Sequence, residues 1–259
     1  MPHVESHAPG AFSWIELGTS DQNAAKTFYT SLFGWTFEDS PMGPGDFYTM
    51  FQLDKRTVGA AYTLREAERS MGVPPHWNLY VTVASADESA AKATELGGQV
   101  VAGPFDVFVY GRMAVIVDPT GASICIWEPK EHIGACTVSE PGSLCWADLV
   151  TPDPEAAAKF YCGLFGWTLV PGEGGYQHLK NGEAFIGGIP PAHHTAPGTP
   201  PHWMSYIQVA DIQASTDKAR ELGATICVGP MSVGSAGSMT VLSDPQGAFL
   251  ALFEVGRAG

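Results

Sequence analysis

The sequence is written twice, and this repetition constrains the fold more than any other feature. Four segments of the first half recur in the second: "AAKTFYTSLFGWT" (24–36) as "AAKFYCGLFGWT" (157–168), "PPHWNLYVTV" (74–83) as "PPHWMSYIQV" (200–209), "ATELGG" (93–98) as "ARELGA" (219–224) and "VDPTGASICIWE" (117–128) as "SDPQGAFLALFE" (243–254). Two copies of about 120 residues therefore lie end to end. We expect an N-terminal tail at 1–11, domains at 12–129 and 144–256, and a linker at 130–143.

Each copy also has an internal order. The first begins with an alternating, strand-like segment, "FSWIEL", followed by a helix that Asp21 caps and Gly34 ends. The corresponding helix of the second copy starts with Asp153 as cap and Pro154 in the first helical position, where a missing N–H costs nothing. Three short strands are expected after each helix.

The same order then starts again within the copy. In the first copy, a strand at 77–83 precedes a helix that Asp87 is expected to open, and strands follow near 99–103, 112–117 and 122–127. "DPTG" (118–121) reads as a tight turn before the last strand. The predicted unit is β-α-β-β-β, used four times, and each copy is expected to fold by itself.

Composition narrows the class of protein. Hydrophobic residues make up 45% and charged residues 15%, which is typical of a packed globular chain. The net charge of −14 repels phosphate backbones and anionic membrane surfaces, so we expect neither a nucleic acid nor a membrane as partner. The start has no signal-peptide pattern, and five cysteines without a CxxC motif suit a reducing cytoplasm and no structural zinc.

One pair of residues in the first strand needs a physical reason. Trp14 and Glu16 are two positions apart, so in a strand they share a face. If that face is buried, the charge is costly, and if it is exposed, the tryptophan is unusual. The second copy repeats the pattern with Trp146 and Asp148.

The four units, the "FYTSLFGW" helix end and the "DPTG"/"DPQG" turns resemble the glyoxalase, or vicinal oxygen chelate, superfamily, over nearly the whole chain. Within it, the chain is similar to the two-domain mycobacterial glyoxalase-like antigen group. The resemblance implies an α+β fold of tandem glyoxalase-like domains. In each domain, two βαβββ units form a curved mixed sheet around a cavity that usually holds a divalent metal.

The metal ligands that the family uses are missing at the matching positions. The resemblance implies a His or Gln near the start of the first strand of a unit and a Glu in its last strand. The residues found there are Trp14, Asn78, Cys125, Trp146, Met204 and Ala251. Indole is no ligand, and Asn and Met are weak ones for zinc or magnesium. We therefore expect no metal and no cofactor. A site made from His76 and Glu16 stays open as an alternative, although two ligands fall short of a site.

The first cavity is expected to be an aromatic box with a few polar groups, which is typical of a small-molecule pocket. Its predicted lining is Trp14, Glu16, Asn78, Tyr80, Cys125 and Trp127. Arg112 either clamps a ligand or forms a structural ion pair with Glu16. Trp127 and Cys125 have ordinary core packing as their alternative. In the second half, Trp146, Asp148 and Tyr206 are the corresponding candidates, in a more apolar cavity; the first half is expected to be the better polar site.

Two functional hypotheses follow. The first is a metal-independent protein that binds or sequesters an aromatic or amphipathic metabolite, as a monomer or homodimer. The second is a glyoxalase-like lyase, isomerase or oxygenase in which Glu16 is the catalytic general base, because burial beside tryptophan raises the pKa of a carboxyl group. The sequence does not decide whether a reaction is catalysed.

Overall fold

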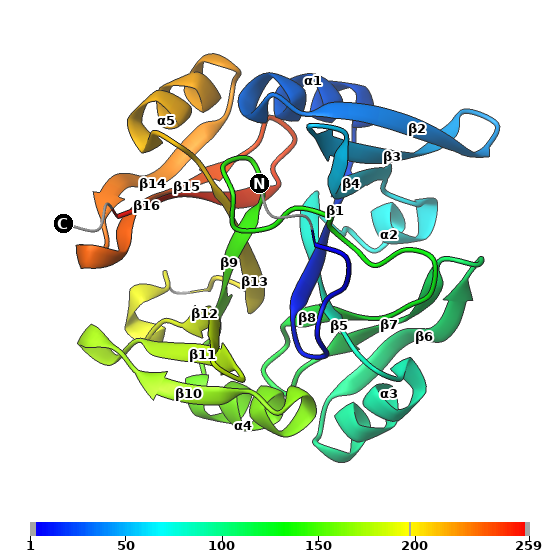
Figure 1. Ribbon diagram of the computed structural model, residues 1–259, viewed down its shortest axis with the longest axis vertical. Coiled ribbons are helices and arrows are strands. Elements are labelled where there is room, and N and C mark those ends of the chain that lie inside the picture. Colours follow the sequence, from blue (N-terminus) through cyan, green and yellow to red (C-terminus); the bar gives the residue numbers. More distant parts are fainter. Residues whose placement is uncertain (1–3, 197, 257–259) are drawn as a thin grey trace.

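The computed structural model describes residues 4–196 and 198–256, and these residues form two curved eight-stranded sheets (Figure 1). The strand order is β2-β3-β4-β1-β5-β8-β7-β6 in the first sheet and β10-β11-β12-β9-β13-β16-β15-β14 in the second. Each sheet is mixed and open. The predicted fold class, α+β with tandem glyoxalase-like halves, is confirmed.

The first half contains eight strands and three helices. They are β1 (Phe12–Thr19), α1 (Gln22–Phe33), β2 (Thr36–Gly43), β3 (Asp46–Leu53), β4 (Arg56–Thr63), α2 (Glu66–Ser70), β5 (His76–Thr82), α3 (Ala86–Glu95), β6 (Gln99–Val107), β7 (Gly111–Val117) and β8 (Ser123–Pro129). Apart from the short α2, this is the β-α-β-β-β order used twice.

The second half repeats the order. Its elements are β9 (Leu144–Val150), α4 (Pro154–Phe165), β10 (Thr168–Pro171), β11 (Gln177–Asn181), β12 (Ala184–Ile189), β13 (His202–Gln208), α5 (Ile212–Glu221), β14 (Thr225–Ser232), β15 (Gly237–Ser243) and β16 (Phe249–Val255). Short 3₁₀ turns at Glu173–Gly175, Ala192–His194 and Gly234–Ala236 join some of them. No helix in the described parts of the chain is long and apolar enough to span a bilayer.

The two units of each half pair with one another. β1 runs antiparallel to β5 and parallel to β4, and β5 runs parallel to β8. In the second half, β9 is likewise antiparallel to β13 and parallel to β12. In the described residues, no strand of one half enters the sheet of the other, so each curved sheet is built from one half alone.

Helix ends follow the sequence signals with one exception. The Asp21 side chain accepts a hydrogen bond from the N–H of Ala24 (2.9 Å), and Gly34 ends α1 with a positive φ of 71°, which glycine adopts without strain. Asp87 was expected to open α3, and this was wrong. Ser85 is the cap, since its Oγ accepts from the N–H of Glu88 (3.2 Å), and Asp87 lies in the first turn.

Helices of the two halves pack against each other in two pairs, at opposite ends of the molecule. Figure 1 shows α1 beside α5 and α3 beside α4, and these pairs are in contact. One continuous hydrophobic core contains buried residues of both halves. Phe12 of β1, for example, packs edge-on against Trp167 and Trp203, with ring centroids 5.2 and 5.4 Å away.

Buried hydrogen bonds also cross between the halves. The hydroxyl of Tyr29 in α1 donates to Asp244 (2.8 Å), which sits in the "DPQG" turn of the second half. Trp167 Nε1 of the second half donates to the carbonyl of Gly10 in the N-terminal tail, and Trp35 Nε1 of the first half donates to that of Gly142 in the linker, each at 2.8 Å. Buried polar groups that lose such partners are destabilising, so each half depends on the other for part of its core.

The shared core argues against the expectation that each half folds by itself, and an isolated half tests that expectation. We predict that residues 1–143 expressed alone lack a cooperative thermal transition and bind a hydrophobic dye, because Phe12 and Tyr29 lose their partners. Circular dichroism melting and dye binding test this, with the full chain as control. A sharp melt of the isolated half, without dye binding, would contradict the prediction.

Candidate functional site

The alternation of β1 explains the unusual pairing of a tryptophan with a carboxylate. Ile15 and Leu17 point into the core shared by the two halves and are fully buried. Trp14 points to the other side and joins a separate cluster on the concave face of the first sheet. Glu16 lies two positions on and shares that face, as the sequence predicted.

Glu16 is held by tyrosine hydroxyls. Tyr80 donates a hydrogen bond to Glu16 Oε2 (2.8 Å), and Tyr48 also hydrogen-bonds to the carboxylate. Trp14 Nε1 approaches the hydroxyl oxygen of Tyr48 at 3.4 Å. In the register of β1 and β5, Trp14 is opposite Tyr80 and Glu16 is opposite Asn78, so the four side chains lie on one face.

The second half builds the same cluster around Asp148. Tyr206 donates to Asp148 Oδ2 (2.8 Å), and Tyr176 donates to Oδ1 (2.6 Å). Trp146 Nε1 lies 3.0 Å from both Asp148 Oδ1 and the hydroxyl oxygen of Tyr176. The structure thus brings together the three residues that the sequence predicted here, Trp146, Asp148 and Tyr206.

Tyr48 and Tyr176 were missed by the sequence analysis. They stand at matching points of the two halves, on or just before the strands β3 and β11, and a comparison of these less similar segments would have paired them. A glycine makes room for one of them: a Cβ at Gly188 would lie 1.9 Å from the hydroxyl oxygen of Tyr176. The glycine-rich segment of β12 therefore allows the close approach of this tyrosine to Asp148.

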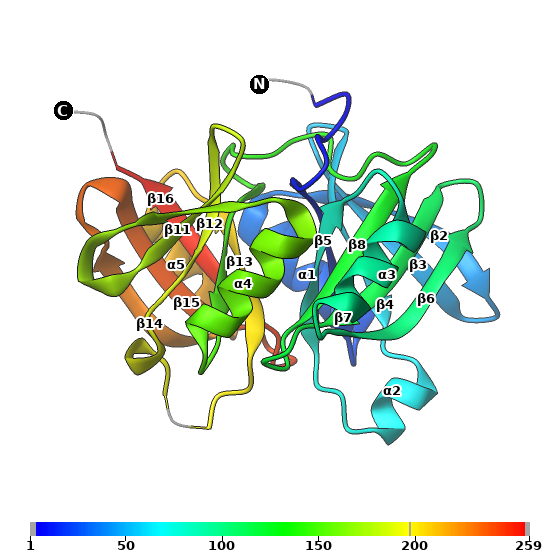
Figure 2. The ribbon, with the colours of Figure 1, turned by 90° about the horizontal axis from the view of Figure 1, so that it is seen from below.

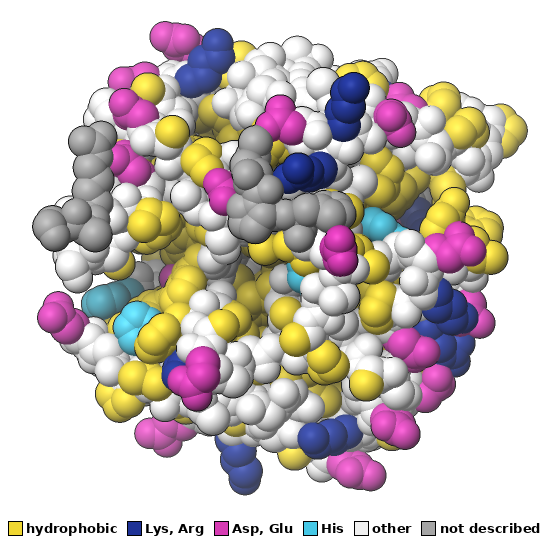
Figure 3. Space-filling view, in the orientation of Figure 1, with side chains coloured by type: hydrophobic (Ala, Val, Ile, Leu, Met, Phe, Trp, Pro, Cys, Tyr) yellow, Lys and Arg dark blue, Asp and Glu magenta, His cyan; other side chains and the backbone are white. Residues whose placement is uncertain are grey.

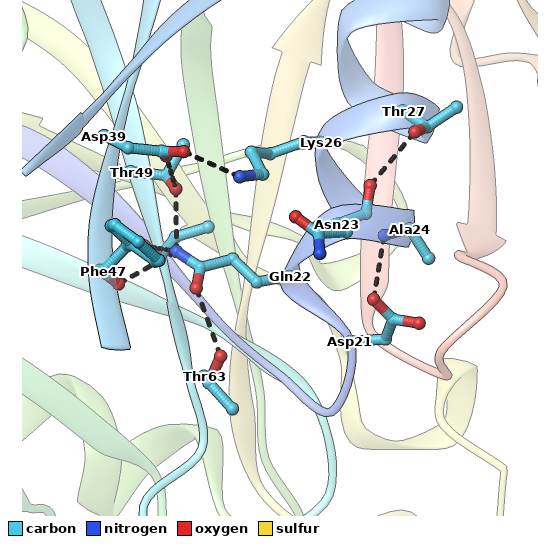
Figure 4. A network of polar contacts seen from close by, with 11 residues as sticks. Asp21, Gln22, Asn23, Ala24, Lys26, Thr27, Asp39, Phe47, Thr49 and Thr63 are labelled. Atoms are coloured by element: carbon cyan, nitrogen blue, oxygen red, sulfur yellow. Dashed lines mark hydrogen bonds and ion pairs between the residues drawn. The ribbon is translucent and has the colours of Figure 1, made fainter. Parts of the chain in front are cut away.

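A buried amide network fixes the strand that carries Tyr48 (Figure 4). Gln22, the first residue of α1, donates from Nε2 to the carbonyl of Phe47 (3.0 Å) and to Thr49 Oγ1 (2.7 Å), on either side of Tyr48. Thr63 of β4 donates to Gln22 Oε1 (3.1 Å). Because these polar groups satisfy one another, the network positions β3 and is not itself a binding site.

Burial dominates the titration of both carboxyl groups. Desolvation raises the pKa of Glu16 above its ordinary value, while hydrogen bonds from Tyr48 and Tyr80 and the charges of Arg65 and His76 oppose the rise. The pKa of Asp148 is raised by the same cause, while hydrogen bonds from Tyr176, Tyr206 and Trp146 and the charge of His178 oppose the rise. Among the described residues, neither carboxyl group is in contact with a lysine or arginine.

Arg112 was expected to reach Glu16, and this was wrong. Its guanidinium forms a bidentate pair with Asp87 (2.7 and 2.9 Å) and lies 3.6 Å from Asp106. In β7, Met113 and Val115 lie on the face opposite to Arg112, and these two residues pack on the concave cluster. Arg112 therefore points to the helix side of the sheet, and the sequence pattern alone gave the wrong face.

The Arg112 geometry predicts how mutations combine. Glu16→Gln and Arg112→Gln are expected to change stability independently, because the two side chains lie on opposite faces. Arg112→Gln and Asp87→Asn are expected to couple, since that pair is in direct contact. Urea midpoints of the single and double variants measure both cycles. Coupling in the Glu16 cycle would show that the two charges interact after all.

The remaining candidates of the first half lie on the predicted face, where most of them pack as part of its surface. Asn78 is half-buried, and its Oδ1 is 3.2 Å from His76 Nε2. Cys125 is 2% exposed, and burial raises the pKa of its thiol, so it is no nucleophile. Trp127 packs in the same cluster and donates from Nε1 to the carbonyl of His132 (2.8 Å).

The linker covers the first concave face. Ala135 is fully buried in the cluster of Trp14, Tyr80 and Trp127, and its N–H donates to the carbonyl of Ser13 (2.7 Å). The ring of His132 stands edge-on to Trp14, with centroids 4.7 Å apart. Figure 1 shows this green segment in front of the first sheet, and Figure 2 shows it on the side opposite α2.

The second concave face is more open. Trp146 and Phe253 are half-buried, whereas their counterparts Trp14 and Trp127 are only 4% and 6% exposed. Figure 3 shows a hollow with hydrophobic side chains inside the curve of the second sheet. The sequence favoured the first half as the better site; it did not reveal that the linker packs over this half and leaves the other accessible.

Metal-ligand side chains do not cluster on either face. Within residues 4–196 and 198–256, no three His, Cys, Asp or Glu side chains come together in a way that could hold a metal ion. Glu16 accepts hydrogen bonds from two phenols and has the imidazole of His76 as a neighbour, while Asp148 is held by two phenols and an indole. Phenol and indole N–H groups that donate to a carboxylate leave it less available as a ligand, so these donor sets do not fit the divalent metal that the family resemblance implies.

The raised pKa of Asp148 predicts a pH-dependent stability difference. A carboxyl group whose pKa is higher in the folded chain than in the unfolded chain stabilises the fold most at low pH, below its unfolded pKa of about 4. This stabilisation is lost as the pH rises through the folded pKa. Relative to Asp148→Asn, the wild type should therefore be most stable at low pH, and the difference should shrink by about 1.4 kcal/mol per unit of pKa shift.

Chemical denaturation from pH 3.5 to 7 measures this difference. Glu155→Gln, a change at an exposed carboxyl group, is the control and should show no such trend. A difference that grows with pH would mean that the hydrogen bonds from Tyr176, Tyr206 and Trp146 outweigh burial.

Comparison with known proteins agrees with this architecture. The model of the Glyoxalase/Bleomycin resistance protein/Dioxygenase superfamily matches residues 11–126 and 143–252. The chain belongs to this superfamily. It is similar to "Putative glyoxylase CFP32" of Mycobacterium tuberculosis, with 39% identity over 98% of each chain, and to "Anthracycline biosynthesis protein DnrV" of Streptomyces peucetius, with 34% identity over 96% and 94% of the two chains.

Solved structures of this superfamily share the fold at low identity. The Mn(II)-bound glyoxalase from Novosphingobium aromaticivorans superimposes with a TM-score of 0.68 at 14% identity, covering 95% of this chain and 82% of the other. The 2,3-dioxygenase LapB from Pseudomonas sp. KL28 gives 0.66 at 14% identity, with 99% and 94% covered. Likeness at this level concerns the fold and not the chemistry.

Proposed function

We propose that this glyoxalase-like protein binds or sequesters an aromatic or amphipathic small molecule on a concave sheet face, without a metal. The observation that carries the proposal is the cluster built in both halves: a carboxylate fixed by two tyrosine hydroxyls next to a tryptophan. Aromatic walls with a few fixed polar groups are typical of small-molecule sites.

The chemistry of the cluster indicates what the ligand offers. Each tyrosine hydroxyl donates its hydrogen to the carboxylate. The lone pairs of the hydroxyl oxygen can then accept hydrogen bonds from a ligand. The described residues place no lysine or arginine in contact with either carboxyl group, and the whole chain carries a net charge of −14. Both features favour a planar ligand with hydroxyl or ammonium groups and disfavour an anionic one.

Two further observations support this reading. Relatives with 34% identity are named for anthracycline biosynthesis, and an anthracycline is a planar, polycyclic compound of the proposed class. The five cysteines are all free thiols, which supports a reducing, cytoplasmic location.

An enzymatic role is the second candidate, and the environment of Glu16 favours it. A half-buried carboxyl group whose pKa is raised by burial can take a proton from a bound substrate near neutral pH. Asn78, opposite Glu16, and His76 beside it could orient such a substrate. Glu16 would then act as the general base of a lyase, isomerase or oxygenase.

A binding measurement with doxorubicin, a fluorescent anthracycline, tests the proposal. We predict that the chain binds it with the same Kd before and after dialysis against a chelator, and that the protein holds well under one divalent metal ion per chain. Quenching of tryptophan fluorescence and elemental analysis are the readouts. Loss of binding on metal removal, restored by added metal, would contradict the proposal.

The enzymatic alternative has its own readout. Turnover of a hemithioacetal by the metal-free protein, lost in Glu16→Gln but kept in Glu155→Gln, would favour catalysis over sequestration. Binding without turnover of this substrate supports the proposed binding role.

A further inference from the structure

The two concave faces differ in one respect: residues of the linker pack on the first face. The ring of His132 packs edge-on against Trp14 (4.7 Å, 87° between planes) and lies 6.0 Å from Trp127. Ala135 and Val138 fill the same cluster. Main-chain hydrogen bonds hold this part of the linker, including Ala135 to Ser13 and Cys136 to Thr57 (2.8 Å).

Among the described residues, the second face has the same floor without that occupant. Strand register makes the correspondence explicit, because Trp14 is opposite Tyr80 in one half and Trp146 is opposite Tyr206 in the other. Among the described residues, His178 lies 6.2 Å from Trp146 and Tyr206 lies 6.4 Å from Phe253 by ring centroid, and the hydroxyl oxygen of Tyr176 is 3.0 Å from Trp146 Nε1. His178 and Tyr206 belong to the sheet and Tyr176 directly precedes β11, so none of these rings takes the place that His132 has on the first face.

We infer that each chain binds one ligand, on the second face, with an aromatic ring seated on Trp146 and Phe253 where His132 sits in the first half. The inference rests on the proposed function and specifies its site and stoichiometry. In the first half, the linker side chains take the place of a ligand. Because the two concave faces have similar shape and chemistry, we expect a similar group to bind on the second face.

Polar groups around the seat define the rest of the ligand. Tyr206 and Tyr176 donate to Asp148, and Trp146 Nε1 approaches the oxygen of Tyr176, so the oxygen of Tyr206 is the acceptor left for a ligand. His178 Nδ1 is buried in the same wall, with no hydrogen-bond partner in the described structure. A ring with a hydroxyl or ammonium group directed at Tyr206 and Asp148 satisfies this arrangement.

The apolar side of the seat supports a flat ligand. Met239, Val241 and Phe253 are half-buried and pack around Met204, Tyr206 and Ala251. At the position of Cys125 in the first half, the second has the smaller Ala251, and at the position of Trp127 it has the smaller Phe253. Smaller side chains deepen the seat and leave room for a ring system larger than the imidazole of His132.

Doxorubicin titrations of matched variants of the full chain test the inference. We expect one molecule per chain by calorimetry. Asp148→Asn should raise Kd by about tenfold or more, the effect of a hydrogen bond to a charged group, whereas Glu16→Gln should change it by less than about twofold. Trp146→Leu should abolish most of the ligand-induced tryptophan quenching, while Trp14→Leu should retain it.

The outcomes separate this inference from the proposed function. Two molecules per chain, or a large loss in Glu16→Gln with none in Asp148→Asn, would overturn the choice of face and leave the binding function intact. If the wild type does not bind doxorubicin at all, both fail. Thermal melts of each variant identify any that is unfolded, and the pair Asp148→Asn and Glu16→Gln, which keeps side-chain size, then decides.

Discussion

The antiparallel pairing of the central strands, β1 with β5 and β9 with β13, is the constraint on which the rest of the molecule depends. Because successive side chains of a strand point to opposite faces, this pairing assigns each residue either to the core or to the concave face. Ile15 and Leu17 fill the core between the halves, while Trp14 and Glu16 face the hollow. A slip of one residue would exchange these roles and bury Glu16 in the shared core.

Burying the carboxyl groups of Glu16 and Asp148 lowers the stability of the folded chain. A buried carboxyl group loses hydration, and hydrogen bonds from tyrosine and indole groups return only part of it, which is why the pKa values of Glu16 and Asp148 stay raised. A fully apolar floor would avoid this cost. The same arrangement kept in both halves indicates a use for the polar groups, and ligand recognition is the use that the geometry supports.

The two halves have the same backbone fold, but different segments pack around their concave faces. The first face has a following linker that packs on it through His132 and Ala135, and the second face has no such cover among the described residues. Conversely, the core depends on both halves, because Tyr29 bonds to Asp244 and Phe12 packs on Trp167. The two halves therefore share one core and carry two unequal hollows.

The sequence by itself determined the duplication, the four β-α-β-β-β units, most helix caps and the shared face of Trp14 and Glu16, because these features depend on local spacing and alternation. Tertiary structure alone decided the contacts between distant segments. It turned Arg112 toward Asp87, brought Tyr48 and Tyr176 to the carboxylates, and laid the linker over the first face. Such contacts depend on sheet curvature and on how loops pack, and no short-range pattern in the chain encodes either.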